Sequence, residues 1–165
     1  MQHIVIQGLY AELNNDSLEN AVDILWANIL PLYFTLTKGY GIMIQQRPWP
    51  GVTKTKADFI IRCVKNGQSK KVCLIEDNRV KHESSGSKWA DVVEQVTGYM
   101  TATRAANLDP NEVMYGIVTI GHYSRFYELW PGERQLRDYS EHDGSPLHFK
   151  HNEPEIDTIL CDLSR

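Results

Sequence analysis

The dipeptide Asn66-Gly67 stands between two runs rich in β-branched and apolar residues, Ala57 to Val64 and Lys70 to Val80. Asparagine and glycine accept the positive backbone angles of tight turns, so this pattern is typical of two antiparallel strands. We therefore expect a β-hairpin whose loop runs from Lys65 to Ser69. Any fold for this chain must accommodate that hairpin.

Helical recurrence of apolar residues predicts three helices around the hairpin. They run from a cap at Asp16 or Ser17 to about Leu30, from about Lys88 to Ala106, and from Glu155 to Leu163. Pro31 is expected to limit the first of them. Further strands are expected at Gly41 to Gln46, Val113 to Ile120 and Arg125 to Trp130, with one more short strand between residues 131 and 154.

The resulting order is helix, three strands, helix, two strands, helix. Strands interleaved with helices indicate an α/β fold with a mixed central β-sheet flanked by α-helices. A chain of 165 residues suits a single domain, which we expect to cover residues 1–165. Its apolar stretches are too interrupted to span a bilayer, so we expect a soluble protein with no membrane partner. Since no secretory signal is recognisable at the N-terminus, an intracellular location, cytoplasmic or nuclear, is expected.

The charge is unevenly distributed along the chain. The net charge is −4, which argues against a protein that coats nucleic acid through bulk attraction. Between Lys54 and Lys88, however, nine basic residues stand against four acidic ones, so this segment carries +5 and the remainder −9. Such a segment can bind a phosphate backbone, and it can equally be a solvated, lysine-rich hairpin.

Antiparallel pairing across the predicted hairpin sets Asp58 near Glu76. Two carboxylates at close range repel each other in a partly dehydrated site unless a cation or a proton lies between them. Phosphodiester hydrolysis gives a reason for such a pair, because hard oxygen ligands hold Mg²⁺ or Mn²⁺. Asp58 and Glu76 are therefore the candidate metal ligands.

Three short motifs carry a family resemblance. They are Lys56-Ala57-Asp58-Phe59, Leu74-Ile75-Glu76-Asp77-Asn78 and, on the second predicted helix, Gln95-Val-Thr-Gly-Tyr99. In this order they resemble the PD-(D/E)XK nuclease superfamily, with the QxxxY motif of its RecB-type branch. The later run from Tyr115 to Glu128 is similar to a set of uncharacterised fungal proteins of this fold. The resemblance covers about residues 16 to 130 and implies a restriction-endonuclease-like core.

The resemblance implies a metal-dependent nuclease that acts on DNA. Asp58 and Glu76 would then bind Mg²⁺ or Mn²⁺, with Gln95 and Tyr99 helping to position the substrate strand. The helix carboxylate that often joins such sites would be Glu19, for which Asp23 is a rival, whereas Asp77 is expected to face the other side of its strand and to pair with a lysine. Basic residues expected to contact nucleic acid are Lys56, Arg62, Arg79 and Lys88. A homodimer is an open alternative to a monomer.

The sequence departs from the family pattern at Asn78, where a lysine is expected. Asn78 shares a strand face with Glu76 but offers no charge and no proton transfer at neutral pH. The candidates for taking over the role of the missing lysine are Lys56, Arg62 and Lys88. Two alternatives to an active nuclease therefore stay open: a binding or interaction module that kept the fold and lost turnover, and an unrelated α/β domain.

Overall fold

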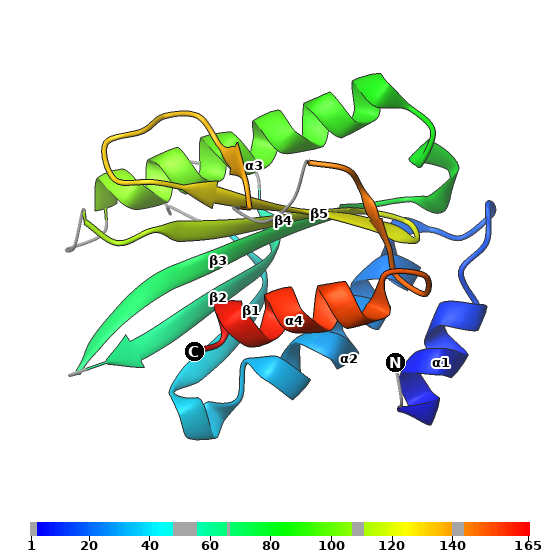
Figure 1. Ribbon diagram of the computed structural model, residues 1–165, viewed down its shortest axis with the longest axis horizontal. Coiled ribbons are helices and arrows are strands. Elements are labelled where there is room, and N and C mark those ends of the chain that lie inside the picture. The colour runs from blue at the N-terminus through cyan, green and yellow to red at the C-terminus, as the bar shows by residue number, and fades with distance from the viewer. Residues whose placement is uncertain (1–2, 48–55, 66, 107–110, 140–143) are drawn as a thin grey trace.

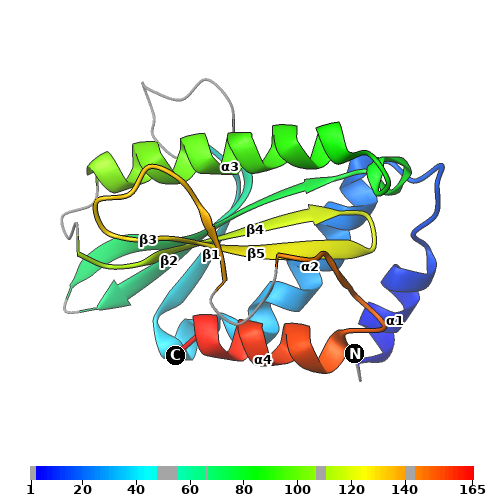
Figure 2. The same cartoon turned by 45° about the horizontal axis from the view of Figure 1, so that its top comes forward.

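A mixed β-sheet with helices on both faces forms the centre of the protein, as a computed structural model describes it for residues 3–47, 56–65, 67–106, 111–139 and 144–165. The strands follow the order β1-β2-β3-β4-β5-β6, and β7 pairs with β5. Helix α3 covers one face of the sheet, and α1, α2 and α4 lie on the other (Figures 1 and 2). The predicted fold class is therefore confirmed.

The elements have the following bounds. The strands are β1 (Tyr40–Gln46), β2 (Ala57–Lys65), β3 (Gln68–Asn78), β4 (Met114–Ile120), β5 (Tyr123–Leu129), β6 (Arg137–Asp138) and β7 (Leu147–His148). The α-helices are α1 (Ile4–Ala11), α2 (Glu19–Tyr33), α3 (Gly86–Ala106) and α4 (Glu153–Leu163). Two short 3-10 helices, η1 (Leu36–Lys38) and η2 (Val80–His82), precede β1 and α3.

Helix α2 differs from the prediction at both ends. Its first residue is Glu19, and neither Asp16 nor Ser17 caps it, because Ser17 Oγ and Asp16 N are hydrogen-bonded to Asn14 in the preceding turn. Local bonds of this kind compete with helix capping. At the other end the helix continues through Pro31 to Tyr33, since proline removes only one hydrogen bond so close to the end.

The predicted hairpin is present as β2 and β3, which pair antiparallel down to Lys65 and Gln68. The turn is tighter than the five-residue loop expected, and Gly67 has the positive φ of 73° that such turns require. Asn66 lies outside the described residues. A one-residue bulge at Ile61 and Arg62 shifts the register, so that Phe59 lies opposite Ile75.

Strands β3 and β4 run parallel and are connected through α3, and β5 then returns antiparallel to β4. The turn between β4 and β5 contains only Gly121 and His122, because β5 begins at Tyr123 and not at Arg125 as predicted. Helix α1 was not predicted, and the C-terminal region holds two short strands in place of one. Strand β3 ends two residues earlier than expected, at Asn78.

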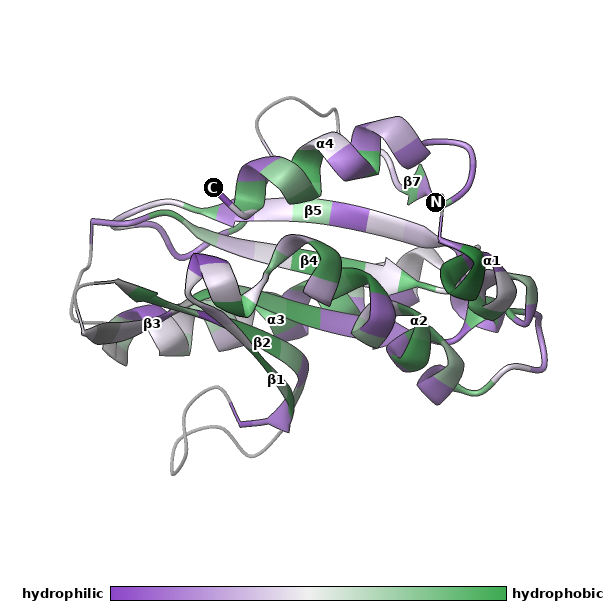
Figure 3. Ribbon diagram, turned by 90° about the horizontal axis from the view of Figure 1, so that it is seen from below, coloured by the Kyte–Doolittle hydropathy of each residue, from purple (hydrophilic) through white to green (hydrophobic). Residues whose placement is uncertain are grey.

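Two hydrophobic cores lie on the two faces of the sheet. One packs α1, α2 and α4 against residues such as Phe59, Ile75 and Ile117. The other packs α3 against Ile60, Leu74 and Val118, which alternate with the first set along the strands. Viewed from the side of α2 and α4, both helices carry hydrophobic and hydrophilic residues, as expected of helices with one buried side (Figure 3). Among the described residues, no helix is both long and apolar enough to cross a membrane.

Candidate metal centre

Three acidic residues meet where β2 begins and β3 ends. Asp58, Glu76 and Asp77 are only 5%, 8% and 1% exposed. The bulge explains why they meet: with Phe59 opposite Ile75, one further residue along each strand brings Asp58 opposite Glu76. Without the bulge, the register fixed by Lys65 and Gln68 would instead set Asp58 opposite Ile75.

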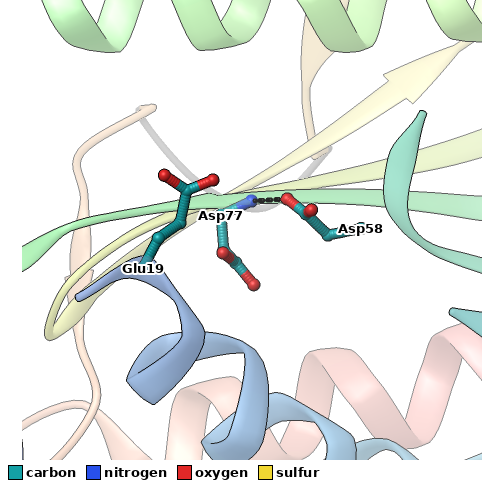
Figure 4. Close-up of side chains that lie close together, drawn as sticks. All are labelled: Glu19, Asp58 and Asp77. Carbon is teal, nitrogen blue, oxygen red and sulfur yellow. Dashed lines mark hydrogen bonds between the residues drawn. The ribbon is translucent and has the colours of Figure 1, made fainter. Parts of the chain in front are cut away.

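Asp77 points to the face of the sheet that α2 covers, as Ile75 does two residues earlier on the same strand. There it joins Asp58 and Glu19, the first residue of α2, and carboxylate oxygens of the three residues lie within 4.8 Å of one another (Figure 4). Asp58 Oδ2 accepts a hydrogen bond from the Asp77 backbone N–H at 2.9 Å. Asp58 Oδ1 accepts one from Gln45 Nε2 at 2.5 Å. We call Glu19, Asp58 and Asp77 the acidic cluster.

Glu76 faces α3 and is held by that helix. Gln95 Nε2 donates to Glu76 Oε1 and also to the Tyr99 hydroxyl, the latter at 2.7 Å. The Tyr99 hydroxyl donates in turn to the backbone carbonyl of Lys56 at 3.1 Å. Gln95 and Tyr99 thus share one helix face, as their spacing predicts, and connect α3 to both Glu76 and the start of β2.

Burial and mutual repulsion raise the pKa values of these acids. Burial is the main cause for Asp58, whose pKa is raised to about 6, with smaller contributions from Asp23 and Glu19. Burial followed by the charge of Asp58 raises the pKa of Glu76 to about 9. The pKa of Asp77 is raised well above its usual value by burial, by Asp58, and by Asp23 and Glu19. Each of these carboxylates is therefore destabilised in its charged form.

The part of the chain that the structure describes provides no basic side chain to neutralise these acids. None of its ion pairs involves Glu19, Asp23, Asp58, Glu76 or Asp77. Four buried carboxylate oxygens also accept no hydrogen bond: Asp23 Oδ1, Glu76 Oε2, Asp77 Oδ1 and Asp77 Oδ2. Buried polar atoms without partners are rare in folded proteins, and each calls for an explanation.

A divalent cation fits this donor set. Mg²⁺ and Mn²⁺ prefer oxygen ligands, and the acidic cluster offers carboxylate oxygens from three separate elements. Glu76 Oε2 and the Asp77 oxygens are buried and accept no hydrogen bond from a conventional donor, and a bound cation would satisfy them. The residues present are therefore suited to holding such an ion.

The other residues singled out from the sequence lie at varying distances from the cluster. Asn78 is at the end of β3, where its Oδ1 accepts from the Arg79 backbone N–H at 2.8 Å. Lys56 is exposed two residues before Asp58, and Arg79 is half-buried beside Asn78. Arg62 is four residues further along β2 than Asp58, about 13 Å away along the strand. Lys88 is seven residues before Gln95 on α3, about 10 Å along the helix axis.

Two residues of the site were not assigned to it from the sequence. Asp77 faces the opposite side of β3 from Glu76, as predicted, but no lysine of the described chain pairs with it. The signal for it was available, because a strand covered by helices on both faces buries acids on either side. No sequence pattern marks Gln45 as part of the site, because its role depends on the pairing of β1 with β2.

Comparison with known proteins supports the fold. Neither a protein-family model nor a curated protein sequence matches the chain. Among solved structures, the chain is similar to the type IIG restriction endonuclease BpuSI, with a TM-score of 0.50 and 17% sequence identity over 86% of this chain. The matched region is 15% of the length of that much larger chain. The likeness establishes a restriction-endonuclease-like fold.

Proposed function

We propose that this protein is a metal-dependent nuclease that hydrolyses phosphodiester bonds of DNA. The observation that carries this proposal is the convergence of five acids, Glu19, Asp23, Asp58, Glu76 and Asp77, with unpaired buried oxygens and no basic partner among the described residues. An arrangement that is unfavourable in itself is retained where function needs it. On a restriction-endonuclease-like fold, divalent-metal chemistry on a phosphodiester is the function that fits best.

Asp58 is central to the proposed site, because it lies beside both Asp77 and Glu76. Glu19, Asp58 and Asp77 would hold the cation, and Glu76 Oε2 is the further donor that the sequence motif implies. When bound, Mg²⁺ or Mn²⁺ would polarise the phosphoryl group and make a water molecule a better nucleophile. Charge neutralisation of the site by the ion would also relieve the repulsion among the acids.

Gln95 and Tyr99 act as a support for the site. By donating to Glu76, Gln95 keeps Oε1 occupied and leaves Oε2 unpaired. Tyr99 fixes the Lys56 carbonyl and with it the backbone that leads to Asp58. This arrangement supports assignment to the RecB-type branch that the QxxxY motif suggests.

The lysine missing at Asn78 has two candidate replacements near the site. Lys56 is exposed beside Asp58, and Arg79 follows Asn78 directly. We propose that these two contact the phosphates next to the scissile bond, whereas Arg62 and Lys88 would contact the nucleic acid further away. We propose further that residues 1–165 act as one nuclease-like unit inside the cell, as a monomer or a homodimer.

Cleavage of single- and double-stranded DNA in Mg²⁺ or Mn²⁺ tests the proposal. Asp58→Asn should reduce the rate at least a hundredfold, because it removes a charged ligand while keeping the shape of the side chain (about 10² or more for a first ligand). Asp91→Asn, an exposed change on α3, is the matched control and should cut at the wild-type rate. Cleavage that persists in Asp58→Asn would rule out this site.

Glu76→Gln and Asp77→Asn separate the contributions of the two neighbouring acids to metal binding. If both residues hold the cation, each substitution should weaken Mn²⁺ binding measured by calorimetry. If only the acidic cluster holds it, Asp77→Asn should lower the affinity and Glu76→Gln should leave it unchanged. Full affinity in Asp77→Asn would remove Asp77 from the site.

Asn78 favours a second candidate function, a nuclease-fold module that binds a partner without turnover. Its amide cannot supply the charge or the proton transfer of a lysine. This alternative predicts no cleavage in any metal, and no loss of biological effect in the Asp58→Ala, Glu76→Ala double variant. Mn²⁺ binding that disappears in that variant would speak against it.

A further inference from the structure

Gln45, near the end of β1, has an unusual backbone conformation. Its φ is 51°, and it is the only residue other than glycine with a positive φ in the described parts of the chain. L-amino acids with a Cβ avoid this left-handed region, which lies outside the range of a β-strand. The side chain of Gln45 is exposed, so burial does not explain the strain.

Gln45 lies directly opposite Asp58. The pairs Ile44–Phe59 and Gln46–Ala57 flank it on either side and keep the normal antiparallel register. Between them, the Gln45 amide Nε2 donates to Asp58 Oδ1 at 2.5 Å, while Asp58 Oδ2 accepts from the Asp77 N–H at 2.9 Å. Both oxygens of this carboxylate are therefore fixed, and the group cannot rotate without losing a hydrogen bond.

We propose that Gln45 is a positioning residue, which uses a strained backbone to hold the Asp58 carboxylate in the orientation that binds the divalent cation. The inference rests on the proposed function, because it assigns Gln45 a role at the same site. Strained backbone persists where the surrounding structure enforces it, and it is frequent at functional sites. Hydrogen bonds that orient a metal ligand commonly contribute tenfold or more to metal affinity.

Glycine and alanine substitutions at Gln45 separate strain from hydrogen bonding. Both remove the amide, but only glycine accepts a positive φ without strain. Without metal, Gln45→Gly should therefore have a higher melting temperature than Gln45→Ala in thermal unfolding. At the neighbouring control position, Gln46→Ala should be more stable than Gln46→Gly, the usual order in a strand, because Gln46 has no positive φ.

Mn²⁺ binding by calorimetry then tests the positioning role. Gln45→Gly and Gln45→Ala should bind Mn²⁺ about tenfold to a hundredfold more weakly than wild type, although Gln45→Gly relieves the backbone strain. Gln46→Gly and Gln46→Ala should bind as wild type does, because the Gln46 side chain donates its hydrogen bond to the Ile44 carbonyl and not to Asp58. Cleavage by Gln45→Gly should recover as the Mn²⁺ concentration is raised.

Three results would overturn the inference, and they are distinguishable. If wild type binds Mn²⁺ and Asp58→Asn does not, but both Gln45 variants bind normally, the role of Gln45 is wrong and the proposed function stands. If wild type itself binds no Mn²⁺, the metal site and the inference fail together. Equal loss of affinity in the Gln46 variants would also contradict it, since the effect would then belong to the strand and not to the Gln45 amide.

Discussion

At the scale of single residues, the site is defined by acids that have no basic partner within the described parts of the chain. Asp58 is the residue on which the others depend, because it accepts hydrogen bonds from Gln45 and Asp77 and its charge raises the pKa of Glu76. A protein that only needed stability would gain from replacing such buried acids. Their presence is a physical argument for a bound cation.

The pH dependence of stability without metal should reflect Asp58. Its pKa is raised from 3.8 to about 6, so the folded state holds a proton that the unfolded state has already released. Stability should therefore fall as the pH rises from about 4 to about 6, by about 2 to 3 kcal/mol from this group. Glu76, with its pKa raised to about 9, should extend the decline to higher pH.

Urea unfolding of wild type and Asp58→Asn over this pH range measures the effect. The difference in the free energy of unfolding should move in favour of the variant as the pH rises, since the amide has no proton to lose. Mn²⁺ should restore the stability of wild type at pH 8 far more than at pH 5. A difference that moves in favour of wild type with rising pH would mean that Asp58 has a stabilising partner.

At the scale of elements, one bulge and one tight turn set the geometry of the site. The bulge at Ile61 and Arg62 sets the register that brings Asp58 opposite Glu76. At the same end of the sheet, the turn of Gly121 and His122 is hydrogen-bonded to the segment after β3. Glu83 Oε1 in that segment accepts a hydrogen bond from the His122 backbone N–H at 2.7 Å. The path of the chain out of β3 is thus held in place by β4 and β5.

Gly121→Ala should destabilise the protein by about 2 to 4 kcal/mol. Gly121 has a φ of 57°, and an added Cβ would clash with Glu83 Oε1 and lie 2.7 Å from Val80 Cα. Gly98→Ala is the control: this exposed glycine on α3 has no neighbour within 4 Å of an added Cβ. That change should stabilise by about 0.5 to 1 kcal/mol, as alanine does in a helix. Urea denaturation measures both, and equal effects would contradict the role of the turn.

At the scale of the whole molecule, the two cores share one sheet. Leu25 of α2 packs in the core on one face, and Met100 of α3 packs in the core on the other. Because β2, β3 and β4 contribute side chains to both, neither core can form without the strands of the other. Asp77 and Glu76 point to opposite faces of the same sheet end, toward α2 and α3 respectively, so the site depends on both cores.

Leu25→Ala and Met100→Ala should each lower the free energy of unfolding by about 2 to 5 kcal/mol, since both side chains are almost fully buried. Each variant should still unfold in one cooperative transition. Unfolding curves from far-ultraviolet circular dichroism and from tryptophan fluorescence should coincide. The fluorescence reports on both cores, because Trp26 lies in one and Trp89 in the other. Separate transitions would show that residues 1–165 do not behave as one domain.

The sequence by itself determined the local structure and the types of chemistry available. Asn66-Gly67 between apolar runs predicted the β2–β3 hairpin, and apolar recurrence predicted α2, α3 and α4, because turns and amphipathic elements depend on residues close in the chain. It also singled out Asp58, Glu76, Gln95 and Tyr99 through short motifs, and the structure brings these residues close together. It missed α1, in which Ile4 is 82% exposed, because that helix buries only one residue and leaves a weak pattern.

Only the tertiary structure decided which side chains meet. Glu19, Gln45, Asp58 and Asp77 come from four different elements, and their approach depends on the docking of α2 and on strand register. A one-residue bulge changes that register without any recognisable mark in the sequence. Patterns along a chain encode the period of a helix or a strand, whereas distances between elements are set by how their buried surfaces pack, and that packing made separate acids into one site.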